Sequence, residues 1–233
     1  MTSAAEVCDK KRRFCQSKFP QVQTMTSDEF LLKYERHTNK LSSNKSPKNN
    51  ADCDLTHTPS NRVVLVDVRT EAEKNVSMIS GSISLQAFEN DFHTLATTED
   101  TDIVFYCTIG YRSGMEAARI CDEYNIDRGR VYSLDGIVPY THALKSHRSS
   151  DTSNVGCASE STASKPSGEM NLITPSGEKT KNVHTFGGEW SCVDMEFNPI
   201  SFGTVSLLVH TFAVGLRLLS YKIRRIFFSS RKK

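Results

Sequence analysis

The stretch "DIVFYCTIGYRSGMEAARICDEY", residues 102–124, decides the fold of this 233-residue chain. An apolar run ends abruptly at Cys107, and a helical pattern begins about five residues later, near Arg112. Ligands bind beyond the carboxyl ends of the strands in a parallel sheet, so this pattern places a thiol where binding sites form. The intervening segment must curl around the sulfur, and Gly110 allows that curl without a Cβ clash.

The loop around Cys107 has the features of an anion-binding site. A curled loop directs its backbone N–H groups inward, and the N-terminus of the next helix adds positive potential. Arg112 places a permanent positive charge beside the bound anion. These groups favour the thiolate, which is the nucleophilic form of cysteine. We therefore predict that Cys107 is a nucleophile rather than a strand-end packing residue.

The other cysteines lack this setting. Cys121 falls on the predicted helix and is interpreted as a packing residue. Five more lie in polar or peripheral segments: Cys8, Cys15, Cys53, Cys157 and Cys192. Seven scattered cysteines without a C-x-x-C pair indicate neither a disulfide framework nor a zinc site, so we expect a reducing, intracellular, cytosol-facing location.

The net charge gives no support for a nucleic-acid-binding protein, and the amino terminus gives none for a secretory signal. The net charge of +2 is too small to indicate nucleic acid as a partner. Residues 1–17 are basic but have no apolar core behind their charges, so they do not form a secretory signal.

Apolar runs alternate with helical patterns through the middle of the chain. Strands are predicted at "RVVLVDVR" (62–69), "SMISGSISL" (77–85, after a turn at Gly81), "TDIVFYC" (101–107) and "RVYSLDG" (130–136). A helix is predicted at 113–125. Farther upstream, "QVQTM" (21–25) predicts a strand and the following residues a helix, capped by Ser27 or Asp28 with Phe30, Leu31 and Tyr34 on one face. This order favours an α/β domain with a mainly parallel sheet flanked by helices.

Composition divides the rest of the chain. Residues 37–61 are rich in Ser, Asn, Lys and Thr and predict a flexible insertion within a domain that spans residues 18–145. Residues 146–179 predict a Ser/Thr-rich linker, and residues 180–196 a returning strand with Trp190 packed on the domain. His184 lies in that extension, and we interpret it as a structural histidine rather than a site residue.

The tail, residues 197–233, contains no acidic residue and carries an apolar stripe at helical spacing. An amphipathic helix on a membrane surface fits this pattern, because basic residues are attracted to anionic lipid. Residues 200–221 also approach the about 20 residues that a membrane-spanning anchor needs, although Arg217 opposes insertion. A helix packed on the protein is the third interpretation. We favour membrane association through residues 200–233.

Several motifs together resemble the rhodanese-like sulfurtransferase family. "CTIGYRS" is similar to its active-site loop, with a cysteine first and an arginine at the sixth position, and "LVDVR" is similar to its Asp-x-Arg, here Asp67 and Arg69. "SMISGSISL" and "VYSLDGIVPYTHA" fall where the family has Gly-His-Ile-x-Gly-Ala and a Leu-x-Gly-Gly turn followed by an aromatic. The sequence departs from the family at three framework positions: Met78, Gly136 and Tyr140. "TKNVHTFGGEW" resembles a carboxyl-terminal extension of some single-domain members.

The resemblance implies sulfur transfer through a Cys107 persulfide, from a donor such as thiosulfate to a thiol or protein acceptor, with no metal or organic cofactor. It implies an anion-binding loop made by Thr108, Ile109, Gly110, Tyr111, Arg112 and Ser113, with Asp67 and Arg69 supporting it. We expect Ile109 and Tyr111 at the mouth of the cavity. Two alternatives remain. One is a non-catalytic rhodanese-like docking module at a membrane. The other is a cysteine phosphatase or arsenate reductase, whose loops usually have five residues between cysteine and arginine rather than four.

Overall fold

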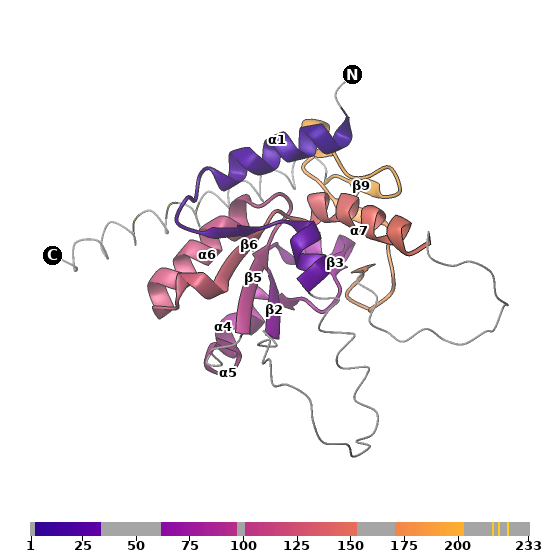
Figure 1. The fold of residues 1–233 in the computed structure, drawn as a ribbon. Helices are drawn as coiled ribbons and strands as arrows, with labels where there is room; N and C mark the ends of the chain where they lie inside the picture. The colour runs from indigo at the N-terminus through magenta and orange to yellow at the C-terminus, as the bar shows by residue number, and fades with distance from the viewer. Residues whose placement is uncertain are drawn as a thin grey trace, which may run out of the picture.

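A computed structural model describes residues 3–33, 62–96, 101–152 and 171–202, together with Leu216, Leu219 and Ile223. Its centre is a five-stranded sheet in the order β1-β6-β5-β2-β4 (Figure 1). Every pair of neighbouring strands in this sheet is parallel. The strands are β1 (Gln23–Met25), β6 (Val131–Leu134), β5 (Thr101–Tyr106), β2 (Arg62–Asp67) and β4 (Ile83–Ser84). The predicted α/β fold with a mainly parallel sheet is confirmed.

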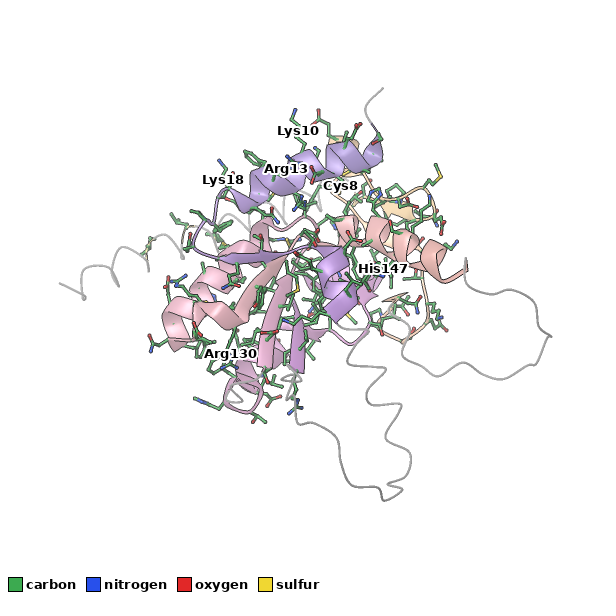
Figure 2. The ribbon with its side chains drawn as sticks, in the orientation of Figure 1. Cys8, Lys10, Arg13, Lys18, Arg130 and His147 are labelled. Atoms are coloured by element: carbon green, nitrogen blue, oxygen red, sulfur yellow. The ribbon has the colours of Figure 1, made fainter. Side chains whose placement is uncertain are left out.

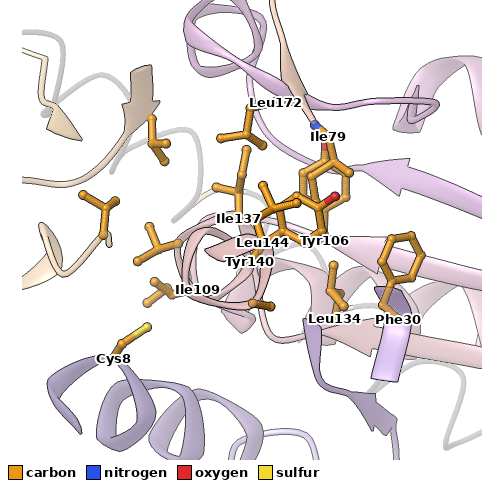
Figure 3. Close-up of a cluster of buried hydrophobic side chains, with 14 of the residues drawn as sticks. Cys8, Phe30, Ile79, Tyr106, Ile109, Leu134, Ile137, Tyr140, Leu144 and Leu172 are labelled. Carbon is orange, nitrogen blue, oxygen red and sulfur yellow. The ribbon is translucent and has the colours of Figure 1, made fainter. Parts of the chain in front are cut away.

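Helices cover both faces of the sheet. The helices are α1 (Ala4–Gln16), α3 (Glu71–Val76), α4 (Leu85–Asn90), α5 (Phe92–Ala96), α6 (Tyr111–Tyr124) and α7 (Ile137–Thr152), with short 3₁₀ turns at η1 (Arg128–Arg130) and η2 (Gly188–Trp190). Strand β5 shows why two layers are needed, because all six of its residues are buried. Val104 and Tyr106 join the apolar cluster under α1 and α7, which Figure 3 shows, whereas Ile103 and Phe105 join the cluster under α4 to α6. This alternation follows from the two-residue period of a strand.

The first strand is confirmed at β1, and the predicted cap of the helix after it is off by one residue. The helix begins at Ser27, and its cap is Thr26. The Thr26 Oγ1 accepts a hydrogen bond from the Glu29 N–H at 3.2 Å, and the Glu29 carboxylate accepts one from the Thr26 N–H at 2.7 Å. This reciprocal pair is a capping box, which needs a glutamate three residues after the cap. Ser27 instead hydrogen-bonds to the buried Asp135.

The segment 77–85 forms two very short strands around the turn at Gly81. Strand β4 joins the main sheet beside β2, as predicted. Strand β3 (Met78–Ile79) pairs antiparallel with β7 (Leu172–Ile173), in a small separate sheet. Strand β7 lies within the range predicted as a linker, and α7 also continues into that range, to Thr152.

The extension, residues 171–202, folds back onto the domain. After β7 it contributes β8 (Asn182–His184) and β9 (Asn198–Ile200), which pair in parallel. Trp190 packs at the edge of the cluster under α1, where the Lys11 Nζ lies 3.8 Å from the centre of its ring. The predicted basic segment 1–17 contains α1. In Figure 2 the side chain of Cys8 lies on α1, and Figure 3 shows it directed into this cluster.

Several predictions fall outside the described residues. These are the insertion at 37–61, the middle of the linker and nearly all of the tail, of which Leu216, Leu219 and Ile223 are helical and exposed. Within the parts of the chain that the structure describes, no helix combines the length and apolar character needed to cross a membrane.

Candidate active site

Cys107 follows the last residue of β5, at the carboxyl edge of the sheet, and its side chain is buried (1% exposed). The chain then turns through Gly110, whose φ is +88°, directly into α6. This left-handed conformation favours glycine. The Ser113 Oγ donates a hydrogen bond to the Cys107 Sγ at 3.6 Å. The predicted strand, loop and helix around the thiol are therefore present.

The segment that joins β6 to α7 packs against the Cys107 loop and hydrogen-bonds to its backbone. The Ile137 N–H donates to the Cys107 carbonyl at 2.9 Å, and the Val138 N–H donates to the Thr108 carbonyl at 3.1 Å. Gly136 makes this approach possible, because a Cβ at this position would lie 2.5 Å from the Thr108 carbonyl oxygen. The glycine of the Leu-x-Gly turn is thus required by the shape of the loop.

Arg112 forms a buried ion pair with Glu73, which the sequence analysis did not identify. Its Nη1 and Nη2 donate to the two carboxylate oxygens at 2.7 and 2.5 Å, and Nη2 also donates to the Thr108 Oγ1 at 3.2 Å. Burial by itself would raise the pKa of Glu73, but the hydrogen bonds and charge of Arg112, together with His184 and the charge of Arg69, outweigh it and hold that pKa well below its usual range. The sequence does not mark Glu73 as the partner of Arg112, because Thr70 and Glu73 form a capping box for α3 and the pattern T-x-x-E predicts only the start of a helix.

The extension adds His184 to this ion pair. The His184 Nδ1 lies 3.2 Å from the Glu73 Oε1. The imidazole stacks on Phe202 with ring centres 4.3 Å apart, and the Arg112 guanidinium carbon lies 5.6 Å from the centre of the Phe186 ring. His184, interpreted from sequence as structural, therefore lies beside the loop arginine.

Asp67 and Arg69 form a second buried network next to the loop. The Arg69 Nη2 donates to the Asp67 Oδ2 at 2.7 Å and to the Ser77 carbonyl at 2.6 Å. The Tyr106 hydroxyl donates to the same Asp67 oxygen at 2.6 Å and accepts from the Ile79 N–H at 3.1 Å. Neither Asp67 nor Arg69 contacts Cys107 in these interactions. They join the ends of β2 and β5 to the turn that carries β3.

A cleft of about 300 Å³ opens beside Arg112, between the end of β2 and the start of α6. Its lining residues are Val68, Arg69, Thr70, Glu71, Lys74, Leu85, Gln86, Arg112, Met115 and Glu116. The two residues expected at the cavity mouth pack elsewhere. Tyr111 makes an edge-to-face contact with Phe19 at 5.3 Å, and Ile109 is buried in the cluster under α1. Within the described residues, no cluster of three or more His, Cys, Asp or Glu side chains could hold a metal ion.

Comparison with known families agrees with this geometry. Residues 54–138 match the family model of the Rhodanese-like domain. The match spans the Asp67–Arg69 strand, the Cys107 loop and the start of α7. No curated protein matches the chain.

Proposed function

We propose that this chain, which carries a rhodanese-like domain, is a sulfurtransferase that moves a sulfane sulfur from a donor such as thiosulfate, through a persulfide on Cys107, to a thiophilic acceptor. One observation carries the proposal. Cys107 is the first residue of a loop that leads from the carboxyl end of β5 into the N-terminus of α6, and its sulfur accepts a hydrogen bond from Ser113. A helix N-terminus favours negative charge at this position.

The reaction has two displacement steps. The Cys107 thiolate attacks the outer sulfur of thiosulfate, so a Cys–S bond forms while the donor S–S bond breaks and sulfite leaves. A thiol or protein acceptor then attacks the outer sulfur of the persulfide and regenerates the Cys107 thiolate. In this scheme Ser113 supplies a hydrogen bond to the reacting sulfur, Arg112 and Glu73 fix the loop, and Asp67 and Arg69 support it from the end of β2.

The ion pair also bears on the phosphatase or arsenate reductase alternative. Four residues separate Cys107 from Arg112, which makes a small loop. The two terminal nitrogens of Arg112 already donate to Glu73 and Thr108, so the guanidinium is not presented to a tetrahedral oxyanion. We therefore expect no phosphatase activity. The docking-module alternative is favoured by one observation, the 1% exposure of Cys107. A donor must then enter by displacing a neighbouring group, and Cys107 is not among the residues that line the cleft beside Arg112.

Intact mass after incubation with thiosulfate tests the proposal. The full chain is used, because β9 and Phe197 belong to the extension that packs on the domain. Wild type is expected to gain one sulfur atom that cyanide removes, whereas Cys107→Ser gains none. Cys121→Ser is the matched control, because Cys121 is also buried on α6 but lies outside the loop. A folded wild type that gains no sulfur, or a Cys107→Ser variant that still gains it, contradicts sulfur transfer and favours the docking module.

We further propose that the tail, residues 200–233, places the domain at a membrane facing the cytosol. The acid-free, basic and apolar composition of this segment supports the proposal. Carbonate extraction tests it, because an anchor stays with the membrane pellet and a surface helix is released. Recovery of the chain in the soluble fraction before any extraction would contradict both forms.

A further inference from the structure

Two free thiols outside the loop, Cys8 and Cys192, lie where α1 meets the extension. His142 of α7 relates the two residues, because its Nε2 lies 2.8 Å from the Cys192 carbonyl and its side chain lines one small cleft together with Cys8. Both belong to the same apolar cluster and are nearly fully buried (5% and 6% exposed). Both sulfurs are reduced in this structure.

Contacts on both sides of the thiols keep α1 and the extension together. One turn after Cys8, the Lys11 Nζ lies 3.3 Å from the Glu189 carboxylate and 3.8 Å from the centre of the Trp190 ring. The backbone carbonyl of Cys192 itself contacts the His142 Nε2 of α7 at 2.8 Å. The thiols are thus held in one arrangement by interactions that do not depend on either sulfur.

The two thiols differ in acidity, which gives each a distinct chemical role. Interaction with the Cys8 thiol lowers the pKa of Cys192, although burial acts in the opposite direction. Interaction with Cys192 and burial raise the pKa of Cys8. Cys192 is consequently the more acidic thiol of the pair, and the thiolate is the form that attacks an oxidant.

A second cleft, of about 190 Å³, is lined by Cys8 but not by Cys192, so an oxidant that enters it meets Cys8 first and reaches Cys192 past it. Its polar lining includes Arg12 of α1, His142 of α7 and the buried Asp135, and Cys8 forms part of its wall. A neutral oxidant such as a hydroperoxide is small enough for this space. The cleft distinguishes this pair from Cys121, which is buried on α6 with no thiol partner among the described residues.

We propose that Cys8 and Cys192 are a redox-active dithiol, which hydrogen peroxide converts into a disulfide that joins α1 to the extension. The Cys192 thiolate attacks one peroxide oxygen, the O–O bond breaks, and hydroxide leaves with a cysteine sulfenic acid at Cys192. The Cys8 sulfur then attacks that sulfenic sulfur, an S–S bond forms, and water leaves with the Cys8 proton. Two thiols are oxidised and one peroxide is reduced to two molecules of water. The inference does not rest on sulfur transfer at Cys107.

Peptide mapping of the full chain, treated with hydrogen peroxide and alkylated without reduction, tests the proposal on wild-type protein. The expected product is a linked pair of peptides that contain Cys8 and Cys192, and dithiothreitol separates them. The melting temperature of the oxidised chain should rise and return to its first value on reduction, because a cross-link restricts the unfolded chain. No linkage between these two residues, or a preferred linkage of either one to a different cysteine, overturns the proposal.

Variants test the roles of the two thiols. In Cys8→Ser, Cys192 should accumulate as a sulfenic acid that dimedone labels, whereas in Cys192→Ser the Cys8 thiol should stay unlabelled at the same peroxide concentration. Cys121→Ser should form the linked peptides as wild type does. Equal labelling of the two single variants would contradict the assignment of Cys192 as the attacking thiolate. Wild-type mapping requires no variant to fold, so it decides the linkage in every case.

Discussion

Replacement of Glu73 by glutamine is expected to destabilise the chain far more than the loss of an ordinary surface carboxylate. Glu73 is fully buried, accepts hydrogen bonds from both terminal nitrogens of Arg112 and lies 3.2 Å from the His184 Nδ1. Glutamine keeps the size of the side chain but leaves the Arg112 guanidinium buried without its counter-charge. Breaking a buried ion pair in this way costs about 3–5 kcal/mol. For a chain of this length the melting temperature should fall by about 6–20 °C.

Thermal or urea unfolding of matched variants measures this cost. Glu189→Gln is the control, because Glu189 pairs with Lys11 at 3.3 Å but its side chain is 90% exposed, and exposed pairs contribute about 0–1 kcal/mol. The double variant Glu73→Gln with Arg112→Met should recover part of the loss, since no buried charge then stays unpaired. If Glu73→Gln costs no more than Glu189→Gln, or if the double variant loses the full sum of its single variants, the reasoning is refuted.

The same pair predicts how stability depends on pH. The pKa of Glu73 in the folded chain lies below its unfolded value of about 4.3. The stabilisation is therefore fully present above about pH 4.3 and is lost as the pH falls toward the folded pKa. Wild type should lose stability on acidification below about pH 4.3, and Glu73→Gln should lose less over the same interval. Parallel pH curves for the two proteins would contradict this assignment.

Two further variants test the framework around the loop. Gly136→Ala should lower the free energy of unfolding by about 2 kcal/mol or more, because φ is +121° and the new Cβ would clash with the Thr108 carbonyl. Gly177→Ala is the control, because Gly177 also has a positive φ (+85°) but its added Cβ would meet no atom within 4 Å, so this variant should lose less stability. Equal losses in the two variants would show that the close approach at Gly136 is unimportant. Burial raises the pKa of Asp135 to about 7, so wild type should lose stability as the pH rises from about 4 to 7, and Asp135→Asn should flatten that slope. If stability depends on pH equally steeply in Asp135→Asn and in wild type, a group other than Asp135 causes the loss.

The central part of the fold is predictable from sequence because its signals are local. The runs at 62–69, 101–107 and 130–136 are continuous and rich in apolar residues, and β2, β5 and β6 lie within them. A strand covered on both faces needs such a run, whatever its neighbours are. The Cys107 loop is predictable for a related reason, since glycine, arginine and serine all lie within six residues of the thiol.

The remaining features depend on partners that are distant in sequence. Arg112 and Glu73 are 39 residues apart, and nothing near Glu73 marks it as more than the end of a capping box. Strand β3 has only two residues, and its partner Ile173 lies within the range predicted as a linker. The cap at Thr26 is predictable from the sequence, because among the successive polar residues Thr26, Ser27 and Asp28 only Thr26 has a glutamate three positions later.

The extension is best understood as part of the site rather than as an appendage. His184 lies against Glu73, and Phe186 lies near the Arg112 guanidinium, so β8 and the residues after it complete the surroundings of the loop arginine. Because Glu73 neutralises Arg112, the full charge of the arginine is not available to a bound anion. In the proposed sulfur transfer, selectivity for a negatively charged sulfur would therefore come from the N-terminus of α6 and from the hydroxyl of Ser113, whose contribution depends on orientation rather than on net charge. The Ser113 hydroxyl also lies 2.9 Å from the Ser133 hydroxyl, so its orientation depends on that neighbour on β6 as well.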